Sequence, residues 1–218
     1  MDQPARLDAI LSAIIDSAIR RANEVERSAE SGSGDYRQED RALDLISELL
    51  WHDASGTVAD ILVSRITKMT LGVQLSLMRD AVEIVDRHTA PLVVHLLAAT
   101  MAAVRWDGHG WLEDIPRPAS EQLERAANAF VNTLMVIDDD WGEPEIRDLQ
   151  PLLSCNEQPV RRAAWVALRC VNSMWHAPMV VAAVSAGLSS ADSAVRSHAA
   201  YIAEEPQRRL DRARRPSS

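Results

Sequence analysis

The chain has 218 residues, of which 47% are apolar and 25% charged, the ordinary balance of a globular protein with a buried core. The formal net charge is -9, and because residues 206–218 carry five arginines and one aspartate, or +4, residues 1–205 carry -13. Such an acidic body disfavours phosphate backbones and favours basic partners, and two cysteines, Cys155 and Cys170, are too few for a disulfide framework or a zinc module.

The start of the chain and its hydropathy favour a cytoplasmic protein that makes no membrane contact. Met1 to Pro4 offer neither the basic segment nor the apolar core of a secretory signal. Apolar runs stay well below the roughly 20 residues that a membrane-spanning helix needs.

An amphipathic helix is predicted near the N-terminus, because apolar residues recur there at the spacing of one helix face: Leu7, Ile10, Leu11, Ile14, Ile15, Ala18 and Ile19. The Ser- and Gly-rich stretch from Ser28 to Asp35 predicts a flexible linker. Residues 1–35 are therefore expected to form a helix followed by a flexible linker. The linker would let this helix dock onto the remainder of the chain from a distance.

Helical patterns succeed one another through the rest of the chain, and no segment alternates like a strand. We predict an all-α protein with further helices over 38–52, 57–68, 72–87, 91–105, 119–137, 144–154, 157–172, 176–187 and 191–205. The Arg-rich residues 206–218 predict a fraying helix end and a disordered tail.

Two helix pairs in the C-terminal third repeat the same pattern. In the first pair, Asn156 in a turn precedes Val160-Arg161-Arg162-Ala163-Ala164; 35 residues later, Asp192 precedes Val195-Arg196-Ser197-His198-Ala199-Ala200. A turn residue, then Val-Arg, then small residues resembles the second helix of a HEAT repeat. A weaker copy, Leu123 to Ala127, lies 37 residues before Val160 and lacks the Val-Arg pair.

The resemblance implies a right-handed α-solenoid of HEAT-like helical hairpins over residues 36–205, with about nine or ten helices in the chain. Each helix pair cannot bury its apolar face alone, so neighbouring pairs stack. HEAT-type solenoids bind other macromolecules, which makes a non-enzymatic protein-binding scaffold, adaptor or inhibitor the expected function.

The helix over 157–172 provides the first candidate binding residues. Its apolar stripe is expected to be Val160, Ala164, Ala167, Leu168 and Val171, which leaves Arg161, Trp165 and Arg169 on another face. The resemblance implies that this face lines the concave groove, with Trp175 and Tyr201 nearby, where Trp and Arg would anchor a partner. In the alternative, Trp165 packs on the neighbouring repeat and the arginines pair with acids such as Asp192.

Two irregular segments are further candidates. Residues 105–118 hold Trp106, Asp107, His109 and Trp111, which either grip a partner or fold back over the helices. Residues 138–145 hold five acids around Trp141, including Asp139 and Asp140. These acids either cap the following helix, with Pro144 in its first turn, or bind a basic protein.

Two other functions stay open at this point. The spacing Asp139-Asp140-x-x-Glu143 is similar to the magnesium motif of class I terpene synthases, although no second metal motif accompanies it. A groove with Arg and Trp is also similar to that of HEAT-like DNA glycosylases. We expect no enzyme, no cofactor and no metal, and a protein partner, with basic partners favoured over nucleic acid.

Overall fold

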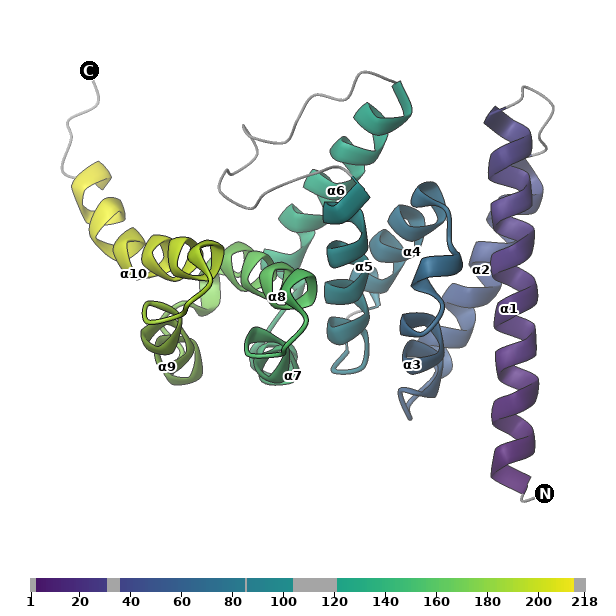
Figure 1. Ribbon diagram of the computed structural model, residues 1–218, viewed down its shortest axis with the longest axis horizontal. Coiled ribbons are helices and arrows are strands. Elements are labelled where there is room, and N and C mark those ends of the chain that lie inside the picture. Colours follow the sequence, from purple (N-terminus) through teal and green to yellow (C-terminus); the bar gives the residue numbers. More distant parts are fainter. Residues whose placement is uncertain (1–2, 31–35, 85, 104–120, 214–218) are drawn as a thin grey trace.

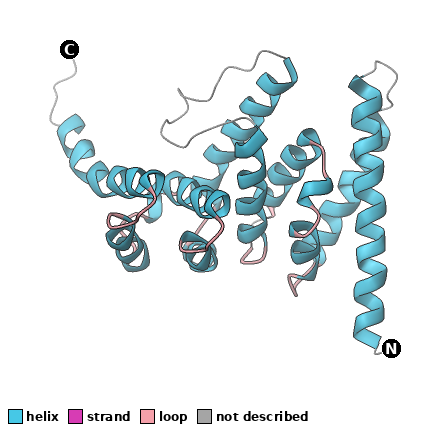
Figure 2. Cartoon of the chain, viewed as in Figure 1, coloured by secondary structure: helices cyan, strands magenta, loops and turns pink. Residues whose placement is uncertain are grey.

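The computed structural model describes residues 3–30, 36–84, 86–103 and 121–213 (Figure 1). These residues form ten α-helices and two short 3-10 helices, and they contain no strand (Figure 2). The all-α prediction and the predicted number of helices are therefore confirmed. The α-helices are α1 (Gln3–Glu30), α2 (Tyr36–His52), α3 (Thr57–Val63), α4 (Leu71–Glu83), α5 (Thr89–Ala103), α6 (Glu121–Asp140), α7 (Glu143–Leu153), α8 (Gln158–Cys170), α9 (Pro178–Gly187) and α10 (Ser193–Ala213). The 3-10 helices are η1 (Ile66–Lys68) and η3 (Asn172–Met174).

The helices are arranged in two rows that run along the long axis of the molecule. Each helix contacts the helix two places further along the chain, so that α1, α3, α5, α7 and α9 form one row and the even-numbered helices form the other. Figure 1 shows the chain progressing from α1 at one end of the array to α10 at the other. Helix α8 lies inside this array, in contact with α5, α6, α7 and α10.

A single apolar core runs through both rows. Ile15 of α1, Ile46 of α2, Leu97 of α5, Phe130 of α6 and Leu168 of α8 are all fully buried members of this core. Because α1 contributes to the same core as the later helices, it packs directly on its neighbours. Ile15, Ala18 and Ile19 of its predicted apolar stripe are buried, and α1 contacts α2, α3 and α4, whereas Leu7, Ile10 and Ile14 of the same stripe are exposed.

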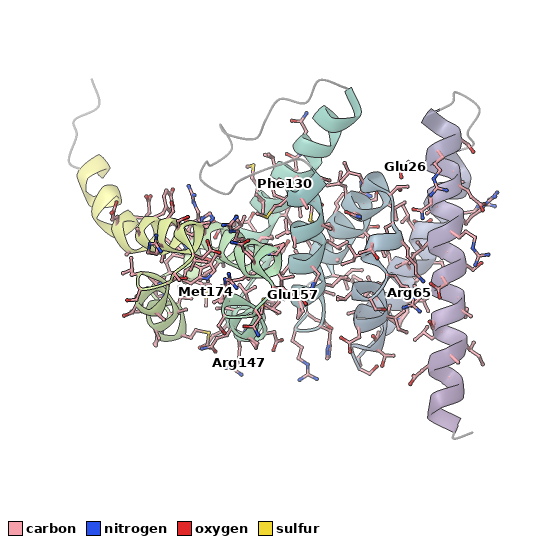
Figure 3. The ribbon with its side chains drawn as sticks, in the orientation of Figure 1. Glu26, Arg65, Phe130, Arg147, Glu157 and Met174 are labelled. Carbon is pink, nitrogen blue, oxygen red and sulfur yellow. The ribbon has the colours of Figure 1, made fainter. Side chains whose placement is uncertain are left out.

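Polar contacts fix α1 against the segment that joins α3 to α4. Arg65 donates to Asp16 over 2.8 Å, and the Asn23 side chain donates to the Lys68 carbonyl over 2.7 Å. Glu26 accepts the Gly72 N–H over 3.0 Å, and Figure 3 shows Glu26 and Arg65 on the side of α1 that faces the array. The expected linker over 28–35 is helical as far as Glu30, and residues 31–35 lie outside the described residues.

The two repeated helix pairs are observed as the hairpins α7–α8 and α9–α10. Asp192 lies at the start of α10 and accepts the Ala194 N–H over 3.0 Å, as expected for a residue that caps a helix. Helix α10 continues to Ala213, so the expected tail over 206–218 begins inside this helix. The Gln, Arg, Leu and Ala residues beyond Pro206 are good helix formers, which explains the longer helix.

Candidate functional site

A cavity of about 370 Å³ opens between α6, α8, η3 and α10, and we call it the α6–α10 groove. Two half-exposed aromatic rings, one buried cation and three carboxylates meet in it, together with the apolar side chains of Leu134 and Met135. These polar and aromatic residues are Asp138, Asp139, Arg169, Trp175, Tyr201 and Glu205.

A stacked set of side chains forms one wall of the α6–α10 groove. The Arg169 guanidinium is buried and lies over the Tyr201 ring, with its Cζ atom 3.8 Å from the ring centroid, the geometry of a cation–π contact. The Trp175 ring meets Tyr201 edge-on, with centroids 5.9 Å apart and ring planes at 86°. Trp175 also donates its indole N–H to the Leu168 carbonyl over 3.1 Å, which fixes the aromatic corner in place.

Three carboxylates also line the groove, two of them from α6 (Asp138 and Asp139) and one from α10 (Glu205). Asp138 accepts hydrogen bonds from the Asn172 amide over 2.5 Å and from the Ser173 N–H over 3.2 Å, so its position is set by η3. Asp139 is exposed, and Glu205 is buried. Three carboxylates against the single Arg169 guanidinium give the lining a formal charge of -2.

The thiol in the lining is chemically inert. Cys170 is fully buried, and this burial, opposed by Arg169 and assisted by Asp138, raises the pKa of the thiol to about 12. At neutral pH the side chain stays protonated, and a protonated thiol is neither a nucleophile nor a good metal ligand. Cys170 thus contributes an apolar surface to the α6–α10 groove.

Sequence-predicted candidates from two separate segments come together here. Arg169 from α8 and Asp139 from α6 both line the α6–α10 groove, and Trp175 and Tyr201 lie with them. Asp140 is exposed in the same helical turn as Asp139 but is absent from the lining.

Trp165 lies in the core, so its expected position on the groove is wrong, and the alternative in which it packs on the neighbouring helix pair is confirmed. Its side chain is only 2% exposed, and its indole N–H donates to the Leu153 carbonyl over 3.2 Å. The ring packs against Gly187 of α9 so closely that a Cβ atom at that position would collide with it. The physical reason is the position of α8 among four other helices, which buries Trp165 as well as the apolar stripe.

Arg161 also lies away from the α6–α10 groove, where it ties the two C-terminal hairpins together. It donates to Asp192 over 3.2 Å and to the Cys155 carbonyl over 2.7 Å, and Arg162 pairs with the same Asp192 carboxylate over 3.2 Å. Burial raises the pKa of Asp192, but hydrogen bonds from Arg162, the Ala194 N–H and Arg161 outweigh it and bring this pKa to about 2. Arg161 therefore follows the alternative in which it pairs with an acid of the chain itself, and Arg162 joins the same carboxylate.

The expectation that acids of residues 138–145 cap α7, with Pro144 in its first turn, is confirmed for Glu145 but not for the three aspartates. Helix α6 continues through Asp138, Asp139 and Asp140, so these aspartates form its last turn and do not cap α7. Glu145 closes the first turn of α7 instead, by accepting the Gly142 N–H over 2.9 Å. Trp141 is 4% exposed and belongs to the core, which corrects its expected place on a binding surface.

The remaining candidates lie in a segment that receives no structural description. Trp106, Asp107, His109 and Trp111 fall within residues 104–120, outside the described residues. Across the described ranges, no three His, Cys, Asp or Glu side chains gather as ligands of a metal ion. None of the helices in these ranges is long and apolar enough to cross a membrane.

The residues of the α6–α10 groove that were not predicted as binding residues include Met135, Asp138 and Glu205. Their spacing in the sequence could have indicated them. Met135 lies one helical turn from Asp139 on α6, and Glu205 lies one turn from Tyr201 on α10. Comparisons with protein-family models, with curated proteins and with solved structures found no match.

Proposed function

We propose that this protein is a non-enzymatic, HEAT-type α-solenoid that binds a partner protein through the α6–α10 groove. The observation that carries the proposal is the groove itself, where a fixed aromatic corner, a buried guanidinium and carboxylates surround a cavity of about 370 Å³. The partner would be held by surface complementarity, without a chemical step.

The composition of the groove supports a protein partner. Aromatic residues, Met and Arg are enriched at the centres of protein interfaces, where a few well-packed side chains supply most of the binding energy. Met135 is 63% exposed at the rim, while Trp175 is already held by its hydrogen bond to Leu168. A site that is ordered before binding loses less entropy when the partner arrives.

The arrangement of the helices supports the solenoid part of the proposal. In a stack of helical hairpins each hairpin contacts its neighbours, which produces contacts between helices two places apart in the chain. All eight such pairs occur among α1 to α10. The Asp192 contacts to Arg161 and Arg162 join consecutive hairpins in the part of the chain that resembles HEAT repeats.

Charge favours a protein over nucleic acid in this groove. Binding to a nucleic-acid backbone depends on several Lys or Arg side chains that neutralise phosphates. The α6–α10 groove offers one guanidinium, buried against Tyr201, among three carboxylates. A basic segment of a protein suits this lining better.

Affinity capture from the source cell tests the proposal with a matched pair of variants. Met135→Arg places a cation at the rim of the groove, whereas Val181→Arg makes the same change on α9, outside the lining, at a residue that is 55% exposed. We expect one protein to be captured by the wild type and by Val181→Arg but lost with Met135→Arg. Equal capture by both variants, or recovery of nucleic acid alone, would overturn the proposal.

A further inference from the structure

We infer that the α6–α10 groove recognises an arginine side chain of the partner, an inference that rests on the proposed function. The groove would take the guanidinium between Asp138 and Asp139 of α6 and the aromatic corner of Trp175 and Tyr201. Four features of the site carry this inference: the charge of the lining, the number of aromatic rings, the fixed carboxylate and the apolar rim.

The charge of the lining calls for a cation. Asp138, Asp139 and Glu205 outnumber Arg169 by two charges, and residues 1–205 carry a formal net charge of -13. A partner side chain with a positive charge would be drawn toward this site and would reduce the repulsion among its carboxylates.

The shape of the lining favours a guanidinium over an ammonium group. A quaternary ammonium ion is recognised by a cage of several aromatic rings, whereas this groove has two rings and three carboxylates. A planar guanidinium stacks on an aromatic face and donates in parallel to a carboxylate. Arg169, which lies over the Tyr201 ring at 3.8 Å, is an example of such a contact within the chain itself.

Asp138 and Asp139 are placed to receive such a group. The hydrogen bonds from Asn172 and Ser173 hold Asp138 in one orientation, and each carboxylate oxygen keeps a second lone pair for a further donor. Asp139 is the next residue of the same helix, and its side chain is exposed. Met135 and Leu134 provide an apolar surface for the methylene groups of the arginine side chain.

Solution NMR of the full chain tests this inference with defined probes. The probes are the capped tripeptide acetyl-Gly-Arg-Gly-amide and two analogues in which lysine or neutral citrulline replaces the arginine. We expect the arginine peptide to shift the indole N–H signal of Trp175 in a saturable way. The lysine peptide should bind several-fold more weakly, and the citrulline peptide should produce no saturable shift.

Two neighbouring aspartates provide the matched variants. Asp139→Asn and Asp140→Asn remove the same charge from the same exposed helical turn, but only Asp139 lines the groove. Asp139→Asn should raise the dissociation constant of the arginine peptide up to about fivefold, the range of an exposed ion pair, and Asp140→Asn should leave it nearly unchanged. Unfolding midpoints of both variants verify that the fold is intact.

The outcomes separate this inference from the proposed function. Equal binding of the arginine, lysine and citrulline peptides, equal effects of the two variants, or no saturable shift of Trp175 would overturn the arginine inference. The proposed function would still stand if Met135→Arg alone abolished capture of a protein. Conversely, arginine binding without any captured protein would refute the proposed function and leave the groove as a guanidinium site.

Discussion

Replacing Asp192 with asparagine removes the carboxylate that joins the two C-terminal hairpins. This side chain is only 4% exposed and pairs with both Arg161 and Arg162. Its pKa of about 2 in the folded protein lies below the ordinary value of 3.8. Since one pKa unit corresponds to about 1.4 kcal/mol, the ionised carboxylate contributes about 2 kcal/mol to the free energy of unfolding at neutral pH.

The sign of the pH dependence follows from the lowered pKa. The contribution of Asp192 is complete above pH 4 and is lost as the pH falls toward the folded-state pKa of about 2, with roughly half of it gone by pH 3. Urea unfolding of the wild type and Asp192→Asn from pH 7 to pH 3 measures this. We expect a gap of about 2 kcal/mol at pH 7 that narrows below pH 4. A gap that stays constant down to pH 3 would refute the assigned role of these ion pairs.

Three further predictions concern the core and the thiols. Trp165→Ala should lower the free energy of unfolding by about 3–5 kcal/mol, because it opens a cavity in the centre of the array; a loss below about 1 kcal/mol in urea unfolding would return Trp165 to the surface. Gly187→Ala should cost about 1–3 kcal/mol in the same assay despite the higher helix propensity of alanine, since the new methyl group meets the Trp165 ring, and a stabilised variant would contradict this packing. Iodoacetamide at pH 8 should alkylate half-buried Cys155 in the native protein and Cys170 only after unfolding, as followed by mass spectrometry; equal labelling rates would contradict the burial of Cys170.

Hydrophobic periodicity was sufficient to locate most helices. The predicted stripe of α8 from Val160 to Val171 is buried throughout, and Asp192 begins α10 as expected for a turn residue. These features depend on neighbours in the chain, and local spacing reports them directly. The predicted ends of the helices were less accurate. Both α6 and α10 continue into charged residues, which are also common in a loop or a tail.

Features that depend on tertiary neighbours were beyond the reach of local spacing. Trp165 would be exposed if only the apolar stripe of α8 were covered by other helices. Helix α8 contacts four helices, which cover it on several sides, and Trp165 is buried as a result. Trp141 stabilises the last turn of α6, which holds the three aspartates. Its backbone N–H donates a hydrogen bond to the Ile137 carbonyl, and its ring lies in the core. The α6–α10 groove was predicted only in part, since Asp139 and Arg169 come from segments 30 residues apart that periodicity treats separately.

Site-specific photo-crosslinking in the source cell tests the binding role of the α6–α10 groove most directly. A benzophenone amino acid placed at Met135, which is 63% exposed, lies on the groove rim, and the same group at Val181, which is 55% exposed, provides a control on α9. We expect a protein adduct of defined mass from position 135 that is absent from position 181. Identical adducts from both positions, or no protein adduct from position 135, would contradict the account.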